Sequence, residues 1–316
     1  MNLVDLAGDF QNADEARAFL EKQRWPNGTV CPHCGLLGES YRLEPKAEST
    51  RPVRKGVWKC KGCRKQFTVT VDTIFSDSHI PLHKWLMAIH LICASKKGMS
   101  AHQLHRMLGV TYKSAWFMAH RIRYAMKQLP AKNKLAGVIE MDETYIGGKQ
   151  RNVGGGRPGK YSNKAAVVSL VQRGGKVVSR HVERVSAQNL RQVLCENAHP
   201  QANIMTDDFT AYNFVASRFR KHDVIKHSSG VYSRREGKKS INTNTAEGFF
   251  SLLKRGIHGS FHHVSKQHLH RYLSEFDFRY NARGVSDGER TLLAIKSVGG
   301  KRLTYRETKE QLPKIK

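Results

Sequence analysis

The sequence has few acidic residues, few cysteines and no long hydrophobic run. Its 316 residues include 26 Asp and Glu against 54 Lys and Arg, which gives a formal net charge of +28. This excess of positive charge indicates a polyanionic partner, most simply nucleic acid, although a ribosome-associated or membrane-surface protein has a similar composition. The longest apolar run, residues 85–94, is too short to span a bilayer, and no secretory signal is recognisable. We therefore expect a cytoplasmic protein with no membrane partner.

Six cysteines are too few for a disulfide framework in a chain of this size, but four of them form two Cys-x-x-Cys pairs. Cys31 and Cys34 make the first pair, and Cys60 and Cys63 make the second, with 25 residues between the pairs. Each pair forms one tight turn that directs two sulfur atoms to a common point. Four thiolates predict a structural Zn²⁺ site in a zinc ribbon, and two redox-active pairs are the alternative.

The segment after the ribbon carries the pattern of a helix-turn-helix. A short helix is predicted at residues 101–108, with Ser100 as its N-cap, and a longer basic helix at 112–127. A glycine turn between two such helices is typical of DNA-binding units, although an ordinary helical hairpin with a charged face has the same pattern. The residues predicted to contact DNA here are Lys113, Arg121 and Arg123.

A predicted strand at residues 137–146 carries acids in an otherwise basic chain. Its alternation of apolar and polar residues predicts β structure, and Asp142 lies near its middle. Asp207 follows a second short strand, and Glu247 lies near the start of a long helical tract. Converging carboxylates repel one another unless divalent cations lie between them, so these three residues are candidate ligands for two Mg²⁺ or Mn²⁺ ions. Asp208 is an alternative to Asp207, and simple pairing with the surplus Lys and Arg is the other interpretation of all these acids.

The order of predicted elements around these acids indicates the fold class. An antiparallel three-stranded meander is followed by a helix, a strand ending at Asp207, a helix at 210–219, a short strand and a long helical tract. This order predicts an α/β domain of the ribonuclease-H-like kind with a mixed sheet, whose first and central strands carry acids side by side. The chain is expected to divide into an N-terminal helix with a zinc ribbon (1–72), a helical helix-turn-helix region (73–130), a catalytic domain (135–285) and a basic C-terminal tail (286–316).

A basic, glycine-rich loop at residues 149–160 separates the first two strands of this domain. It contains a formal G-x-G-x-x-G match, but Pro158 and an ensuing strand replace the helix that a dinucleotide site requires. A loop that lies against DNA phosphates and a solvated hairpin both fit its composition. Its candidate DNA contacts are Lys149, Arg151, Arg157 and Lys160.

Four motifs occur together in this chain: WKCKGCRKQF (58–67), MDETYIGG (141–148), TDDFTAY (206–212) and NTAEGFFSLLKRG (244–256). Their combination resembles a bacterial insertion-sequence transposase that pairs a zinc ribbon with a DDE catalytic domain of ribonuclease-H-like fold. The resemblance covers about residues 12 to 310. Between the first and second of the three acids lie 64 residues, and between the second and third lie 39.

The resemblance implies a reaction, a set of partners and one further site residue. Water first attacks at the transposon end and frees a 3′-OH, which then attacks target DNA in the same site. Lys254 shares a helix face with Glu247, and a lysine there contacts the transposon-end DNA in such enzymes. The implied partners are the terminal inverted repeats, target DNA and at least one further copy of the chain, all at the bacterial nucleoid. A catalytically silent DNA-binding regulator and a structure-selective nuclease on the same fold are the alternatives.

Overall fold

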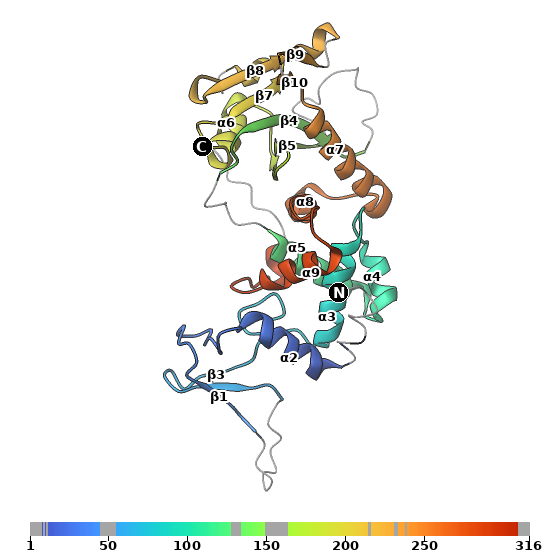
Figure 1. Cartoon of the computed structure of the whole chain (residues 1–316). Helices are drawn as coiled ribbons and strands as arrows, with labels where there is room; N and C mark the ends of the chain where they lie inside the picture. The colour runs from blue at the N-terminus through green and yellow to red at the C-terminus, as the bar shows by residue number, and fades with distance from the viewer. Residues whose placement is uncertain are drawn as a thin grey trace. The chain divides into compact units, whose positions relative to one another are not determined.

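The computed structural model describes residues 8, 10, 12–44, 55–127, 134–148, 164–213, 216–230, 233–237 and 239–308. The contacts divide the chain into two compact units (Figure 1). The first unit takes its described residues from the ranges Met1–Ser95, Met99–Met126 and Val285–Thr308, and the second from Lys96–Gly98 and Lys127–Gly284. Every helix among the described residues is too short or too polar to span a bilayer.

The N-terminal part of the first unit is a helix followed by a small antiparallel sheet. Helix α2 (Ala13–Arg24) begins after Asn12, whose side chain accepts two hydrogen bonds from N–H groups of the first turn. The strands, in the order β1-β2-β3, are Ser40–Arg42, Trp58–Cys60 and Gln66–Phe67. Trp25 packs edge-on against the rings of Trp58 and Phe67. A sheet this small buries little apolar surface and needs another source of stability, which a bound metal ion supplies in zinc ribbons.

A cluster of helices completes the first unit. These helices are α3 (Leu82–Ala94), α4 (Ala101–Leu108), α5 (Tyr112–Met126) and α9 (Asp287–Lys296), and a 3₁₀ turn follows at Tyr305–Thr308. The predicted capping of α4 is confirmed, since the side chain of Ser100 accepts a hydrogen bond from the N–H of Gln103. Gly109 ends α4 in the left-handed conformation (φ 58°). The short helix, glycine turn and longer helix are therefore present in the predicted order.

Helix α9 corrects the prediction of a basic tail from residue 286 onward. Ser286 and Glu289 form a capping box at its start. The helix packs on α3, where Oγ1 of Thr291 lies 3.0 Å from Nδ1 of His90. Residues Val285–Thr308 consequently belong to the first unit, while Lys309–Lys316 lie outside the described residues.

The second unit is built on a mixed sheet whose five described strands have the order β6-β5-β4-β7-β8 (Figure 1). They are β4 (Val138–Ile146), β5 (Ala165–Gln172), β6 (Val177–Val182), β7 (Asn203–Asp207) and β8 (Lys221–Ile225). Strands β4, β5 and β6 pair as an antiparallel meander, whereas β7 lies parallel to β4 and β8 lies parallel to β7. Helix α6 (Ala187–Asn197) connects the meander to β7. A hairpin of β9 (Arg234–Glu236) and β10 (Lys239–Ile241) follows β8. The predicted α/β class with a mixed sheet is confirmed.

Helices cover both faces of this sheet. On one face, α6 packs on apolar side chains that include Ile139 and Met141 of β4. On the other face lie α7 (Asn244–Gly256), a π-helical segment (Ile257–Phe261) and α8 (Lys266–Asn281). Side chains alternate along a strand. The even-numbered residues of β4, which include Glu140 and Asp142, therefore share with Ile146 the face that α7 covers.

Two details of the second unit concern predicted helices. The sequence predicts one helix at residues 210–219, but the described residues there form two 3₁₀ turns, Thr210–Tyr212 and Ala216–Arg218. Helix α7 ends at Gly256. A Cβ at this position would lie 2.3 Å from Cζ of Phe276 and 2.8 Å from the backbone oxygen of Lys97, so no larger residue fits.

Candidate metal centres and DNA-contacting residues

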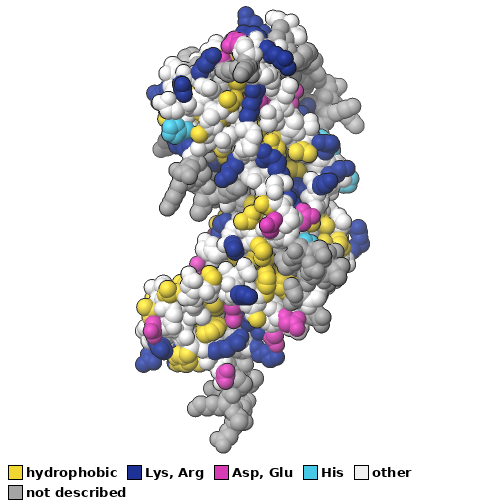
Figure 2. Space-filling model, in the orientation of Figure 1, with side chains coloured by type: hydrophobic (Ala, Val, Ile, Leu, Met, Phe, Trp, Pro, Cys, Tyr) yellow, Lys and Arg dark blue, Asp and Glu magenta, His cyan; other side chains and the backbone are white. Residues whose placement is uncertain are grey.

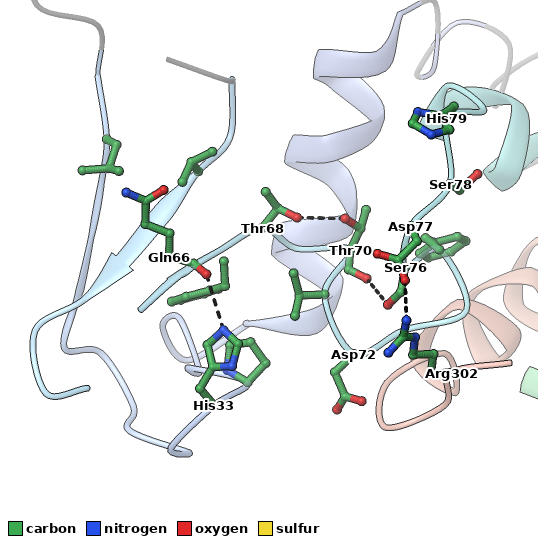
Figure 3. A pocket seen from close by; sticks show the side chains of 16 residues that line it. His33, Gln66, Thr68, Thr70, Asp72, Ser76, Asp77, Ser78, His79 and Arg302 are labelled. Carbon is green, nitrogen blue, oxygen red and sulfur yellow. Dashed lines mark hydrogen bonds and ion pairs between the residues drawn. The ribbon is translucent and has the colours of Figure 1, made fainter. Parts of the chain in front are cut away.

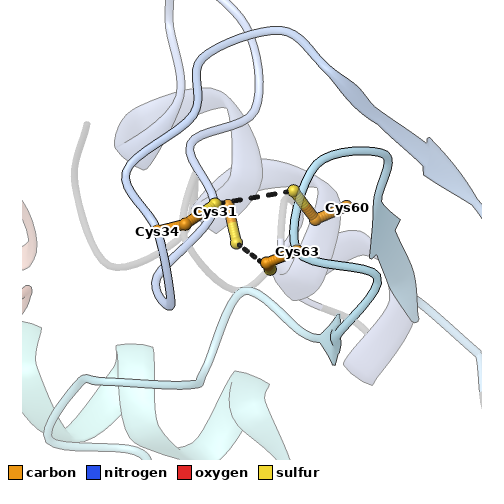
Figure 4. Close-up of side chains that lie close together, drawn as sticks. All are labelled: Cys31, Cys34, Cys60 and Cys63. Carbon is orange, nitrogen blue, oxygen red and sulfur yellow. Dashed lines mark hydrogen bonds between the residues drawn. The ribbon is translucent and has the colours of Figure 1, made fainter.

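The four predicted zinc ligands come together at one point (Figure 4). Their ligand atoms all lie within 4.8 Å of one another. The Sγ atoms of Cys31 and Cys63 are 3.6 Å apart, and those of Cys34 and Cys60 are 3.7 Å apart. Four thiolates at about 2.3 Å from one zinc ion lie about 3.8 Å from each other, whereas disulfide sulfurs are about 2 Å apart. The spacing fits a tetrahedral zinc site and excludes disulfides among these residues.

The local backbone favours the metal-binding form of the Cys60 thiol. The pKa of the Cys60 thiol is lowered to about 7, chiefly because the backbone N–H of Cys63 donates to its sulfur. A lowered pKa favours the thiolate, which is the form that binds zinc. His33 lies inside the first pair but is not part of the cluster, and its Nε2 lies 3.4 Å from the backbone oxygen of Gln66. The chain therefore offers four sulfur ligands to a structural zinc ion.

The elements of the second unit bring the three predicted carboxylates to one region. The register of the parallel strands β4 and β7 pairs Glu140 with Met205, and continuing it by two residues places Asp142 beside Asp207. Both side chains point to the face that α7 covers. Glu247 lies in the first turn of α7, and α7 packs on β4. Residues far apart in the chain therefore come to one region, beside the middle of β4 and the end of β7.

The pKa of Asp142 is raised by burial and by the charges of neighbouring acids. Burial raises the pKa of this carboxyl to about 7, and the backbone N–H of Glu143, 2.8 Å from Oδ1, opposes the rise. Repulsion from Glu143, Asp207 and Glu247 raises it further. A buried carboxyl whose pKa is raised in this way is typical of functional sites. A bound cation would remove the repulsion and return the carboxyl to its ionised form.

Asp207 and Asp208 have different surroundings, which bears on the choice between them. Oδ1 of Asp207 accepts a hydrogen bond from the N–H of Phe209 at 3.2 Å, and its charge acts on Asp142. Asp208 instead accepts a hydrogen bond from the hydroxyl of Ser228. This geometry supports Asp207 as the acid beside Asp142, and the assignment as a ligand stays a prediction.

Two further acids of β4 have partners that the sequence pattern did not reveal. Glu140 is fully buried and accepts hydrogen bonds from the start of α7. Glu143, on the opposite face, accepts a hydrogen bond from the hydroxyl of Tyr212. Burial, with the charge of Glu143, raises the pKa of Tyr212 well above its usual range, so this hydroxyl remains a donor. The bond ties β4 to the turn that follows Asp207.

The predicted DNA contacts differ in exposure. Lys254 on α7 and Lys113 in the first turn of α5 are exposed. Arg121 and Arg123 are only 7% and 2% exposed, and Nε of Arg121 donates to the backbone oxygen of Leu303 at 3.1 Å. The prediction that these two arginines contact DNA is wrong in this fold, because their charged groups are enclosed by protein. The four candidates in the glycine-rich loop, Lys149, Arg151, Arg157 and Lys160, lie outside the described residues. On the face of the molecule shown in Figure 2, basic side chains are numerous and widely spread, whereas acidic side chains are fewer.

A pocket of about 1220 Å³ lies in the first unit, beside the zinc ribbon (Figure 3). Much of its polar lining is already paired, since Oγ1 of Thr68 lies 2.8 Å from Oγ1 of Thr70 and Arg302 pairs with Asp77 at 2.8 Å. Its lining includes none of the three carboxylates in the second unit. The pocket is therefore separate from the candidate catalytic site.

The fold and its sites define a class of protein: an α/β domain with acids on its central strands, preceded by a zinc ribbon and a helix-turn-helix segment. Comparison with known protein families shows which kind of protein within this class the chain resembles. Residues 134–281 match the ISXO2-like transposase domain, and residues 11–66 match the transposase zinc-ribbon domain. The chain is also 27% identical over 294 residues to a Halobacterium salinarum protein described as an uncharacterized protein in transposable element ISH50. That match covers 85% of this chain and 91% of the relative.

These matches confirm the resemblance to insertion-sequence transposases with a DDE domain and an N-terminal zinc ribbon. The chain carries a transposase domain, and a transposase acts on DNA. The zinc-ribbon match and the four clustered sulfur atoms both support a structural zinc ion as a cofactor of this chain.

Proposed function

We propose that this chain cleaves DNA at the ends of its own mobile element and transfers the freed 3′-OH into target DNA, in a metal-dependent reaction. The observation that carries the proposal is the cluster of Asp142, Asp207 and Glu247. Two adjacent parallel strands and one helix supply these acids, and burial together with the charges of Asp207 and Glu247 raises the pKa of Asp142.

The three carboxylates would hold two Mg²⁺ or Mn²⁺ ions, which polarise the scissile phosphate and stabilise the leaving oxygen when bound. Hard oxygen ligands suit these ions. Among the described residues, only the four cysteines bring three or more ligand atoms within 4.8 Å. The wider spacing of the acids is compatible with two ions about 4 Å apart, because ligands of different ions need not approach one another.

The chain's own residues have distinct tasks in this proposal. The acids would hold the ions, and they would fix the site relative to the DNA backbone. Lys254, which is exposed and lies two helical turns beyond Glu247, would contact a phosphate of the transposon end. The displacement needs no covalent enzyme intermediate, so no Ser or Tyr nucleophile is required.

The remaining parts of the chain would bind DNA and a second copy. Lys113, exposed at the start of α5, lies where the recognition helix of a helix-turn-helix contacts base edges and phosphates. Joining two transposon ends in one complex requires at least a dimer.

The direct experiment is a strand-transfer assay with purified protein, Mg²⁺ and DNA that carries the terminal repeats of the element. Asp142→Asn and Asp207→Asn should each abolish nicking and joining while end binding, measured by gel shift, is retained. Asp208→Asn is the matched control, because it makes the same chemical change at the neighbouring residue and should leave the reaction largely intact.

The alternatives predict different outcomes in the same assay. End binding with no metal-dependent cleavage by the unaltered chain would contradict the proposal and favour a DNA-binding regulator. Cleavage without joining, or a preference for branched DNA, would favour a structure-selective nuclease. Activity in Asp142→Asn would show that the site lies elsewhere.

A further inference from the structure

Glu140 is a fully buried carboxylate whose oxygens are both engaged. It lies on β4, two residues before Asp142, and is 0% exposed. Oε2 accepts hydrogen bonds from the backbone N–H groups of Thr245 (2.7 Å) and Ala246 (3.0 Å). Oε1 accepts from the hydroxyl of Thr245 (2.9 Å) and from Nε of Arg173 (2.6 Å). A buried charge is costly unless it is paired in this way.

Three of these bonds come from the first turn of α7. The first N–H groups of a helix have no partner within the helix and are usually satisfied by the side chain of the N-cap residue. Here the N-cap residue Thr243 makes no such bond. The N–H of Asn244 is satisfied by the side chain of Asn242, and the next two N–H groups are satisfied by Glu140. A residue of the central strand therefore caps this helix, and its negative charge suits the helix N-terminus.

Arg173 extends the same network to the segment that precedes α7. Its guanidinium donates to the backbone oxygens of Ser240 and Asn242 and to Oδ1 of Asn242. The arginine thus holds both Glu140 and the entry to the helix. Glu247 follows the capped N–H groups by one position and accepts a hydrogen bond from the hydroxyl of Thr243 at 3.3 Å. The first turn of α7 is fixed to β4 just before it presents Glu247.

We propose that Glu140 is a positioning residue: it fixes the first turn of α7 on β4 and so sets Glu247 in place to share divalent ions with Asp142. This inference rests on the proposed function. Glu140 is not itself a metal ligand, because its oxygens are enclosed and committed to four donors. Partners that orient metal ligands typically change metal affinity by roughly 10- to 100-fold when they are removed.

The test measures Mn²⁺ binding to the full-length, zinc-loaded protein by electron paramagnetic resonance, so that it does not depend on activity. Glu140→Gln keeps the shape of the side chain but removes the charge, and it should raise the Kd for Mn²⁺ by roughly tenfold or more. Asp277→Asn is the matched control, because it alters another buried carboxylate of the same unit, one that is hydrogen-bonded to Ser179 on β6. It should leave the Kd unchanged.

A double-mutant cycle separates positioning from general loss of structure. If Glu140 acts through Glu247, then Glu140→Gln should add little to the loss of affinity already caused by Glu247→Gln. Additive losses would contradict the proposal, and so would an unchanged Kd in Glu140→Gln. If Glu140→Gln does not fold, Thr245→Val decides the question, since it removes one of the four bonds. A smaller rise in Kd supports the proposal, and no rise overturns it.

The experiment also distinguishes this inference from the proposed function. Unchanged Mn²⁺ binding in Asp142→Asn and Glu247→Gln would contradict the proposed metal site, and the proposed function with it. Loss of binding in those two variants, with normal binding in Glu140→Gln, would leave the site in place and reject only the role of Glu140.

Discussion

The buried carboxyl of Asp277 should make the second unit less stable as the pH rises. Asp277 lies on α8 and accepts hydrogen bonds from the backbone N–H and the hydroxyl of Ser179 on β6, both at 2.7 Å. Burial raises the pKa of Asp277 to about 7, although the bonds from Ser179 and the charge of Arg180 oppose the rise. The ordinary value is 3.8, so the folded chain holds this proton more tightly than the unfolded chain does.

The sign and size of the effect follow from that difference. Stability from the protonated form is fully present below the unfolded pKa and is lost as the pH rises toward 7. A rise of about 3 pKa units, at about 1.4 kcal/mol each, amounts to about 4 kcal/mol as an upper limit. Asp277→Asn imitates the protonated acid, so it should stabilise the second unit by up to about 4 kcal/mol at pH 8 and have little effect near pH 4.

Urea unfolding of the two proteins at pH 5 and pH 8 measures this, and the tryptophans provide an internal control. All of them lie in the first unit, at positions 25, 58, 85 and 116. Tryptophan fluorescence should therefore report a transition that Asp277→Asn leaves unchanged, while hydrogen exchange at the amides of β5 and β6 should slow at pH 8. An equal effect of the substitution at both pH values would refute the reasoning.

Four further substitutions test other contacts. Cys60→Ser should lose the single zinc ion and make residues 12–66 sensitive to protease while the second unit resists, because structural zinc supplies the folding energy of such domains; a resistant, zinc-free ribbon would contradict the assignment. Tyr212→Phe removes the hydrogen bond to Glu143 and should destabilise the second unit by roughly 1.5–3 kcal/mol in chemical unfolding, whereas no loss would show that the bond contributes nothing. Lys113→Ala should reduce the salt dependence of DNA binding by about one charge. Arg121→Ala should leave that slope unchanged and lower the thermal midpoint, and the reverse pattern would restore Arg121 as a DNA contact.

Local signals in the sequence were sufficient for much of the fold. The cap at Ser100, the turn at Gly109 and the strand alternation around Asp142 depend on neighbouring residues, and the structure has them where they were predicted. The two Cys-x-x-Cys pairs likewise fix their own turns. The structure confirms that the four sulfur atoms lie together. This could be predicted because one tetrahedral zinc ion requires four ligands around a single point.

Contacts between distant parts of the chain account for what was missed. Arg121 has the composition of an exposed helix face, but the segment around Leu303, far along the chain, covers it. Helix α9 carries a capping box that is readable in the sequence, yet the basic charge of the last residues favoured a tail. No pattern near Glu140 indicates that it caps a helix 105 residues away. Nor does any pattern show that Tyr212 lies against Glu143.

Diffraction from crystals soaked in Mn²⁺, recorded with the anomalous signal of manganese, would locate the metal ions in the second unit. The account predicts manganese between the carboxyl groups of Asp142, Asp207 and Glu247, with Glu140 still bound to the start of α7 and not to the metal. Manganese bound elsewhere, or absent from these carboxylates when DNA ends are also bound, would contradict it.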